Sequence, residues 1–503
     1  MAGLHTVGIV GTGAMGGGIA QVCAQAGVGV LLYDAVAGAA QACYQRIAEV
    51  FATLERKGRI SATEAAQALS RIHVSQALAD LQGCDLVVEA IVEKLEAKQA
   101  LFKALEQVVS ADCILASNTS SLSITAIASG CQHASRVAGL HFFNPVALMK
   151  VVEVIDGLQT DPAVTQRLLE LITRVGHWPV QSRDTPGFII NHAGRAYGTE
   201  ALAILGEQVA PVAVIDRVLR EAMGFRMGPF ELFDLTALDV SHPVMESIYQ
   251  QYYQDPRYRP SVLTRQMLAA GQVGRKSGQG FYRYPPVEEA TAPPRQASCS
   301  PPVWVGADDP RDKQALEHWL EGLGVRLDTG ARPSAESLCL LAPYGRDATG
   351  AALAFGSDPE RTLCIDMLPG LGRHRTLMST PVTRLTLQDF ALATFGGDGV
   401  GVSLIEDSLG FICQRVMAAI VNLASDIAQQ GVAAPQDINR AVQLGLGYPQ
   451  GPLAWGDELG AKRLLTVLER MADTSRDPRY RPSPWLRRRA ELGCSLSFVR
   501  PLC

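Results

Sequence analysis

The chain has 503 residues, which is too long for one ordinary hydrophobic core, so two to four domains are expected. Hydrophobic residues make up 47% of it and charged residues 19%, which excludes a disordered chain. The net charge of -5, from 45 basic and 50 acidic residues, offers no broad basic field for nucleic acid or an anionic membrane.

The cysteines point to reduced thiols and a cytoplasmic location. Eleven of them are scattered without a CxxC pair or a Cys/His cluster at zinc spacing, so no metal site is predicted. The stretch from Val7 to Tyr33 has no charge, and on length alone it fits a membrane span or signal segment. Its many glycines would break a membrane helix, so we expect a strand, a turn, a helix and a second strand instead.

Residues 1–183 alternate short β-branched runs with helical stretches, a pattern typical of a parallel sheet covered by helices. The runs are TVGIV, VGVLLYD, LVVEAIV, CILASN, RVAGLHFF and VVEVI. From residue 184 to residue 284 helical periodicity takes over, as in PVAVIDRVLREAMGF. The sequence therefore predicts an α/β domain over 1–183 and an all-α domain over 184–284.

The second half of the chain repeats this order after a linker. Residues 285–302 are rich in Pro, Ala and Ser without an apolar period and predict an extended linker. Residues 303–402 again alternate strand-like runs with helices, but no glycine fingerprint follows the first run. We predict a degenerate α/β domain there, without a nucleotide site, and a second helical domain over 403–503.

The helical domain is duplicated. DPRYRPS occurs at residues 255–261 and again at 477–483, and the segment that begins at Asp407 matches the one that begins at Asp184. The copies differ, because Asn191 is replaced by Gln414 and GRKSGQGFYRY has no counterpart in the second. We infer that the first copy serves the active site and the second serves packing.

A dinucleotide fingerprint follows the first strand. Gly11-x-Gly13-x-x-Gly16 leads into a helix, and Asp34 ends the second strand about 20 residues on, where the ribose of NAD needs an acceptor. A carboxylate there would repel a 2'-phosphate, so NAD is favoured over NADP. The alternative is that the glycines serve tight packing and that Asp34 is a surface turn residue.

One histidine and one carboxylate lie near the carboxyl edge of this sheet. His141 stands in GLHFFNPV and Glu153 follows twelve residues later in VVEV. This pair suits a base whose tautomer is fixed by an acidic partner. The alternative is a structural histidine.

Seven motifs in order resemble the L-3-hydroxyacyl-CoA dehydrogenase family: GTGAMGGGIA, VEAIVE, SNTSSL, GLHFFNPV, VVEV, DTPGFIIN and GRKSGQGFY. The resemblance covers residues 4–284 and in part 407–483. It implies a Rossmann-type NAD-binding domain followed by an all-α domain. The architecture of the whole chain resembles the long stand-alone members that act on 3-hydroxyadipyl-CoA in phenylacetate breakdown. 3-Hydroxybutyryl-CoA and general fatty-acid β-oxidation stay open as alternatives.

The resemblance also implies the catalytic roles. His141 would take the proton from the 3-hydroxyl group of the acyl-CoA while the hydride passes to NAD, and Glu153 would orient His141. Ser120 and Asn191 would hydrogen-bond the substrate oxygen, where charge develops. Lys57, on the helical stretch after Asp34, is the expected contact for the CoA phosphates, although a solvated surface charge is the alternative.

The cofactor-binding positions that the resemblance implies are Gly11, Gly13, Ala14, Met15, Gly16, Asp34, Glu93, Lys98, Asn118, Ser120, Asn144 and Lys276. For Lys98 and Lys276 the alternative is a solvated surface lysine.

Other functions are weaker on the same residues. The β-hydroxyacid and 6-phosphogluconate-type dehydrogenases use a lysine on the helix that here begins GFIINHAGR. The segment GFIINHAGR contains no lysine, which argues against these two families. A reductase of free hydroxy acids within the superfamily, and an NAD sensor without catalysis, stay open. A fused hydratase domain is not expected. The acyl-CoA substrate is the expected partner, and the chain is expected to be a homodimer or an internally duplicated pseudo-dimer.

Overall fold

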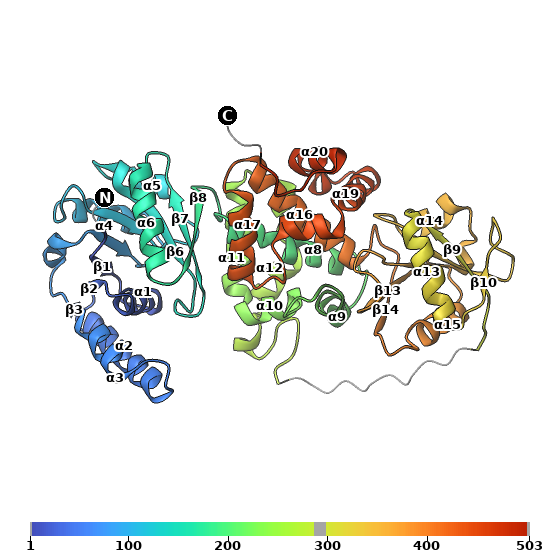
Figure 1. The fold of residues 1–503 in the computed structure, drawn as a ribbon, viewed down its shortest axis with the longest axis horizontal. Helices are drawn as coiled ribbons and strands as arrows, with labels where there is room; N and C mark the ends of the chain where they lie inside the picture. The colour runs from blue at the N-terminus through green and yellow to red at the C-terminus, as the bar shows by residue number, and fades with distance from the viewer. Residues whose placement is uncertain (1–2, 286–297, 500–503) are drawn as a thin grey trace. The chain divides into compact units, whose positions relative to one another are not determined.

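The computed structural model describes residues 3–285 and 298–499 (Figure 1). Most of the predicted linker, residues 286–297, lies outside the described residues. The chain divides into two compact units. The first unit combines residues 1–192 with 430–446, and the second holds the remainder.

The first unit contains an eight-stranded sheet in the order β3-β2-β1-β4-β5-β6-β7-β8. Its strands are β1 (Thr6–Val10), β2 (Gly29–Tyr33), β3 (Ile72–Val74), β4 (Leu86–Glu89), β5 (Ile114–Ser117), β6 (Val137–Phe142), β7 (Val151–Asp156) and β8 (Trp178–Arg183). Neighbouring strands are parallel except β6 and β7, which are antiparallel. The parallel sheet expected from the sequence therefore contains one antiparallel pair.

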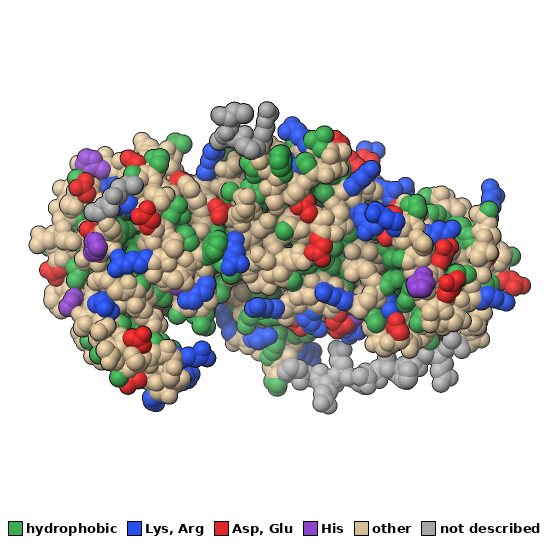
Figure 2. Space-filling view, viewed as in Figure 1, with side chains coloured by type: hydrophobic (Ala, Val, Ile, Leu, Met, Phe, Trp, Pro, Cys, Tyr) green, Lys and Arg blue, Asp and Glu red, His purple; other side chains and the backbone are tan. Residues whose placement is uncertain are grey.

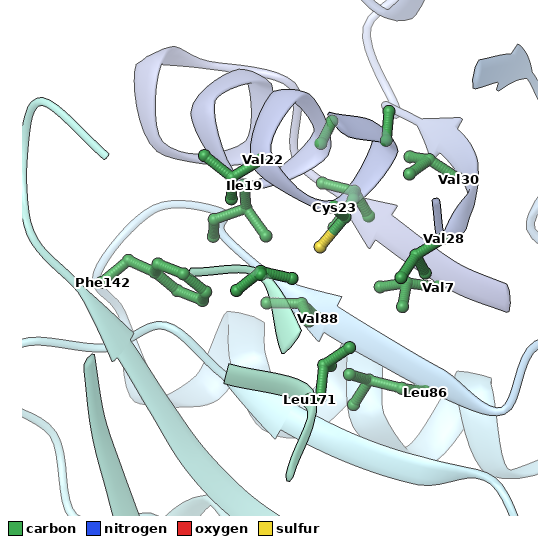
Figure 3. Close-up of a cluster of buried hydrophobic side chains, with 14 of the residues drawn as sticks. Val7, Ile19, Val22, Cys23, Val28, Val30, Leu86, Val88, Phe142 and Leu171 are labelled. Carbon is green, nitrogen blue, oxygen red and sulfur yellow. The ribbon is translucent and has the colours of Figure 1, made fainter. Parts of the chain in front are cut away.

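Helices cover both faces of this sheet. They are α1 (Ala14–Gln25), α2 (Ala39–Arg56), α3 (Ala62–Ser70), α4 (Leu95–Glu106), α5 (Ile124–Ala128), α6 (Pro162–Arg174) and, from the second helical copy, α17 (Pro435–Leu446), with α7 (Ile190–Ala193) at the unit boundary. Ile19 of α1 and Leu171 of α6 pack with Val88 in one core (Figure 3). Phe102 of α4 and Ile127 of α5 belong to a second core. The two cores hold the sheet rigid, so its strand ends present side chains in fixed positions.

The second unit contains a six-stranded sheet in the order β10-β9-β11-β12-β13-β14. Its strands are β9 (Val303–Ala307), β10 (Leu327–Asp328), β11 (Leu338–Ala342), β12 (Thr362–Ile365), β13 (Arg375–Ser379) and β14 (Val402–Ile405). The sheet packs with α13 (Pro310–Gly322), α14 (Ala348–Phe355) and α15 (Leu385–Phe395). As in the first sheet, one pair near the end, β12 and β13, is antiparallel and the next pair is parallel.

The same unit contains the two helical copies, except α17 and the start of the first copy up to residue 192. The first copy comprises α8 (Arg195–Gly206), α9 (Val212–Met223), α10 (Pro229–Thr236), α11 (Leu238–Gln251) and α12 (Val262–Ala269). The second comprises α16 (Ile412–Gln429), α18 (Pro452–Leu459), α19 (Ala461–Ser475) and α20 (Pro484–Leu492). α8 and α16 pack against each other. Buried Arg415 of α16 bonds Glu200 of α8 at 2.9 Å.

The two DPRYRPS motifs meet at this packing surface. Their short helical turns, η3 (Pro256–Tyr258) and η6 (Pro478–Tyr480), contact each other. Arg257 of the first motif pairs with Asp426 of the second copy. Arg479 of the second motif reaches Glu200 of the first copy at 3.6 Å. In each motif, the first arginine therefore reaches an acidic residue of the other copy.

The units do not coincide with the predicted domains. The first unit extends to residue 192 instead of 183, and it takes residues 430–446 from the predicted second helical domain. Within the described residues, no helix is long and apolar enough to cross a membrane, and each described cysteine is free. On the face shown in Figure 2, cationic and anionic side chains are interspersed.

Candidate active site

The loop between β1 and α1 has the backbone that a dinucleotide needs. Gly11 has φ +93°, and a Cβ on Gly16 would lie 1.9 Å from the carbonyl oxygen of Gly11. Both positions therefore require glycine. A Cβ on Gly13, the N-cap of α1, would meet no atom within 4 Å, so the open space that a pyrophosphate requires is present there.

Asp34, directly after β2, faces this loop. Its Oδ2 accepts hydrogen bonds from the backbone N–H and the hydroxyl of Thr12, and its Oδ1 accepts one from the Val36 N–H. Although burial acts in the opposite direction, these bonds from Val36 and Thr12 lower the pKa of Asp34. One lone pair of Oδ1 stays available for a ribose hydroxyl. Asp34 is thus an ionised acceptor that is held beside the glycine loop.

A pocket of about 540 Å³ opens beside Asp34. It is lined by the glycine loop and by apolar residues, among them Gly11, Thr12, Gly13, Val36, Leu78 and Ile91. Ala14 and Met15 form the first turn of α1 next to it. An apolar slot with a bare glycine loop and one carboxylate fits the adenosine half of NAD.

His141 and Glu153 are brought together by the antiparallel pair of strands. They are direct partners in the register of β6 and β7, and His141 Nδ1 lies 2.6 Å from Glu153 Oε2. Both side chains are buried. The ring of Phe143 lies 4.2 Å from the imidazole, centroid to centroid. The structure therefore places the Glu153 carboxylate in contact with the His141 imidazole.

The other oxygen of Glu153 is held by backbone. Its Oε1 accepts hydrogen bonds of 2.9 Å from the N–H groups of Ile189 and Ile190. The turn that aims them contains Phe188 at φ +50°, a conformation that costs a non-glycine residue about 1–3 kcal/mol. Its counterpart in the second copy, Phe411, has no positive φ. The strain occurs only in the copy that carries the carboxylate contact.

This arrangement suits His141 as a base. A carboxylate can only accept, so Nδ1 carries the proton in the hydrogen bond to Glu153. Nε2 is then the nitrogen with the free lone pair, and among the described residues it has no hydrogen-bond partner. A proton taken up at Nε2 would give an imidazolium stabilised by Glu153.

The loop after β5 sits on Glu93. Glu93 Oε1 accepts from the Thr119 hydroxyl at 2.6 Å and from the Ser120 N–H at 2.9 Å. Lys98 lies behind it, 2.6 Å from Glu89 and 3.2 Å from the second oxygen of Glu93. Although burial acts in the opposite direction, the bond from Thr119 and the charge of Lys98 lower the pKa of Glu93.

Lys98 is only 1% exposed, so the alternative of a solvated surface lysine is wrong for it. Its ammonium group is engaged by two carboxylates, which makes it a support for Glu93 and for the Ser120 loop.

Three asparagines stand at different points of the same region. Asn191 Nδ2 donates a 3.4 Å hydrogen bond to the carbonyl oxygen of Ser120. Asn118 Oδ1 accepts from the Phe142 N–H and so fixes the end of β6. Asn144 is exposed in the loop after β6. The structure therefore brings Ser120 and Asn191 together.

Two other lysines that were predicted to bind the cofactor or CoA are exposed. Lys276 is 54% exposed and lies in the second unit, where it pairs with Asp239. Lys57 is exposed at the end of α2. Their parts in cofactor and CoA binding stay predictions.

In the second α/β domain and its helical copy, other residues stand at the positions that correspond to His141 and Asn191 of the first. Asp407 accepts from Ala348 N–H at the start of α14 as Asp184 does from Ile124 N–H at the start of α5, which aligns the two domains. On that alignment Asp366 follows β12 at the place of His141, and its N–H bonds Thr376 on β13. Gln414, at the place of Asn191, donates to Asp366 Oδ1 at 3.0 Å.

Sequence reasoning missed several residues of the site. Arg46 donates to the carbonyl oxygen of Thr12 in the glycine loop, and Ser117 donates to Glu89 beneath Lys98. The two amides of Ile189 and Ile190 carry no side-chain signal. A charged Glu89 at the end of an apolar strand, with Lys98 on the next helix, was the one signal available.

Two family models match residues of both halves of the chain but not residues 285–409. The model described as "3-hydroxyacyl-CoA dehydrogenase, NAD binding domain" matches residues 6–185. The model described as "3-hydroxyacyl-CoA dehydrogenase, C-terminal domain" matches twice, over residues 187–284 and 410–495. The second match falls on the repeat that begins near Asp407.

Individual relatives fall into two lengths. The chain is 37% identical over 492 residues to the 3-hydroxyadipyl-CoA dehydrogenase of Escherichia coli, covering 98% of both. It is 42% identical to a probable 3-hydroxybutyryl-CoA dehydrogenase of Deinococcus radiodurans, which covers only 55% of this chain. A crystal structure titled 3-hydroxybutyryl-CoA dehydrogenase from Escherichia coli superimposes with a TM-score of 0.87 at 36% identity, covering 98% of this chain and 99% of that one.

Proposed function

The chain belongs to the 3-hydroxyacyl-CoA dehydrogenase family, and on that premise we propose that it oxidises an L-3-hydroxyacyl-CoA to the 3-oxoacyl-CoA, with 3-hydroxyadipyl-CoA as the preferred substrate. The observation that carries the substrate is the match of 98% of both chains to a relative with that name. The duplicated layout is therefore shared along with the catalytic half.

His141 is the proposed general base. Its Nε2 takes the proton of the 3-hydroxyl group, and Glu153 stabilises the imidazolium that forms. NAD supplies the nicotinamide that accepts the hydride from C3. The buried position of the His141–Glu153 pair keeps water from competing for the proton.

Ser120 and Asn191 are the proposed contacts of the substrate oxygen. They lie close together, since Asn191 bonds the Ser120 backbone, and both offer polar groups where charge develops on oxygen. Glu93 and Lys98 fix the Ser120 loop. Lys57 is the proposed contact of a CoA phosphate, and Asn144 and Lys276 are proposed on the cofactor side.

The test is an assay of NADH formation with 3-hydroxyadipyl-, 3-hydroxybutyryl- and a long-chain 3-hydroxyacyl-CoA. We expect the highest kcat/KM with 3-hydroxyadipyl-CoA and little activity with NADP. Turnover of free hydroxy acids in place of the CoA esters would contradict the proposal.

A second candidate substrate is 3-hydroxybutyryl-CoA, because the E. coli structure of full length and the half-length relatives carry that name. The same assay decides between them. A cytoplasmic location is also proposed, supported by cysteines that are all free among the described residues.

A further inference from the structure

The second helical copy contributes one helix to the unit that contains the active site. Residues 430–446, including α17, belong to the first unit, whereas the rest of that copy belongs to the second. α17 contacts β7, the strand that carries Glu153, and the neighbouring strand β8. A helix from a copy without catalytic residues thus packs on the catalytic sheet.

Specific contacts with β8 occur just before α17 and in the middle of this helix. Just before the helix, the carbonyl oxygen of Val432 accepts a 2.9 Å hydrogen bond from the Arg183 N–H at the end of β8. Within the helix, the Arg440 guanidinium stacks over the Trp178 ring at 4.8 Å. Ile438 is fully buried. The segment is therefore fastened to the edge strand of the sheet.

The last turn of α17 reaches the residue that holds Glu153. A Cβ on Gly445 would lie 2.5 Å from Cδ1 and 3.1 Å from Cγ1 of Ile190. Ile190 is buried, and its N–H is one of the two donors to Glu153 Oε1. The chain of contacts runs from Gly445 through Ile190 to Glu153 and His141.

The first copy makes the reciprocal contact within the second unit. There the Val209 carbonyl oxygen, just before α9, accepts a 2.9 Å hydrogen bond from the Glu406 N–H just after β14. α9 also contacts β13. The same hydrogen bond, between the segment before a helix of one copy and the end of the last strand of the other sheet, therefore occurs twice. This contact is a property of the duplicated fold and not of one loop.

We propose that α17 is a positioning element of the active site, with Gly445 as its positioning residue, which holds Ile190 so that its amide keeps Glu153 aligned with His141. The proposal rests on the function proposed above. It gives the second helical copy a part in catalysis without a catalytic residue of its own.

The experiment is Gly445→Ala in the full-length chain. Alanine is the better helix former, so α17 itself is not weakened. Ile190 must shift, and we expect kcat to fall by roughly 10- to 100-fold, since a misplacement of about 1 Å can cost that much. The KM for NAD should stay unchanged. Ile190→Val in the same chain removes the clashing Cδ1 and should restore most of the kcat.

Hydrogen exchange of the Ile189 and Ile190 amides is the second measurement, and it also serves if Gly445→Ala folds poorly. Ile438→Ala, which removes a buried side chain of α17, should speed this exchange and lower kcat. The exposed Gln436→Ala on the same helix is the control and should change neither.

Two outcomes overturn the proposal: a wild-type kcat in Gly445→Ala, or a lowered kcat that Ile190→Val does not restore in a folded protein. Both are measured against an active wild type. A wild type without activity on any 3-hydroxyacyl-CoA would instead defeat the proposed function.

Discussion

The proposed catalytic pair, His141 and Glu153, could be predicted from the sequence, but the backbone groups that hold Glu153 could not. His141 and Glu153 could be predicted, because their motifs carry the resemblance and their side chains do the chemistry. The Ile189 and Ile190 amides could not, since any residue supplies an N–H and only the strained Phe188 turn aims them. Lys98 is an intermediate case, because a charged Glu89 at the end of an apolar strand was the one sequence signal that its ammonium group is buried there.

Removing the base tests the site most directly. His141→Ala should lower kcat by about 10²- to 10⁴-fold, because proton transfer from the 3-hydroxyl group loses its acceptor. NADH affinity, measured by fluorescence titration, should stay within a small factor, since the Gly11–Gly16 loop is untouched. The exposed His133→Ala is the matched control. A kcat near that of the wild type would remove His141 from the mechanism.

Asp34 should decide the cofactor. Asp34→Ala removes the acceptor for the ribose, and a hydrogen bond to a charged group is worth about 1.5–3 kcal/mol, so the KM for NAD should rise roughly 10- to 100-fold. Discrimination against NADP should fall at the same time. Asp34→Asn separates shape from charge, and the readout is kcat/KM with both cofactors. Equal use of NADP by the wild type would show that the assignment is wrong.

At the scale of elements, the apolar runs of the sequence predicted where most strands lie, but they did not predict which strands run antiparallel. The six apolar runs of the first domain correspond to β1, β2, β4, β5, β6 and β7. β3 and β8 were missed because the first has three residues and the second contains Pro179. An apolar run looks the same in either direction, so the antiparallel pair that aligns His141 with Glu153 had no signal.

The Asp366 element of the second α/β domain should make stability depend on pH. Burial raises the pKa of the Asp366 carboxyl to about 7, and its Oδ2 has no hydrogen-bond partner among the described residues. An unfolded aspartate titrates near pH ~3.9. Between these two pH values the folded state keeps a proton on Asp366 that the unfolded state has lost. The stabilisation of the fold by this proton is complete below pH ~3.9 and is lost as the pH rises through about 7.

Asp366→Asn should remove that dependence, because the amide is neutral and its oxygen can still accept from Gln414. We expect the variant to melt at least a few degrees higher than the wild type at pH 8, where about 1 kcal/mol shifts Tm by roughly 2–4 °C in domains of this size. The difference should shrink at pH 5. The exposed Asp473→Asn is the control. A gap that widens toward pH 5 would contradict the buried-proton argument.

At the scale of the whole molecule, the duplication could be predicted from the sequence, but the packing of α17 on the first sheet could not. Two copies of DPRYRPS predict duplication, and the contacts of Arg257 with Asp426 and of Arg479 with Glu200 show where the copies meet. No local pattern indicates that α17 leaves its own copy for the first sheet, because that choice depends on pairings more than 200 residues apart in sequence, such as Arg183 with Val432.

Shortening the chain to residues 1–285 should therefore produce self-association. Such a chain matches the length of the relatives that cover 55% of this one. It lacks α16, so the face of α8 is uncovered, and Glu200, only 1% exposed, loses Arg415. A second copy of the short chain offers its own α8 face, so each copy can cover the other.

Light scattering and NADH assays across a range of concentrations check this. We expect the short chain to be dimeric or larger, with an activity that falls on dilution, whereas the full-length chain keeps its activity because linkage holds the second copy at an effective concentration of about millimolar. Loss of α17 should also lower kcat in the associated short chain, since Ile190 then lacks its support from Gly445. A monomeric short chain with full activity at every concentration would show that the second copy neither covers the first nor supports its active site.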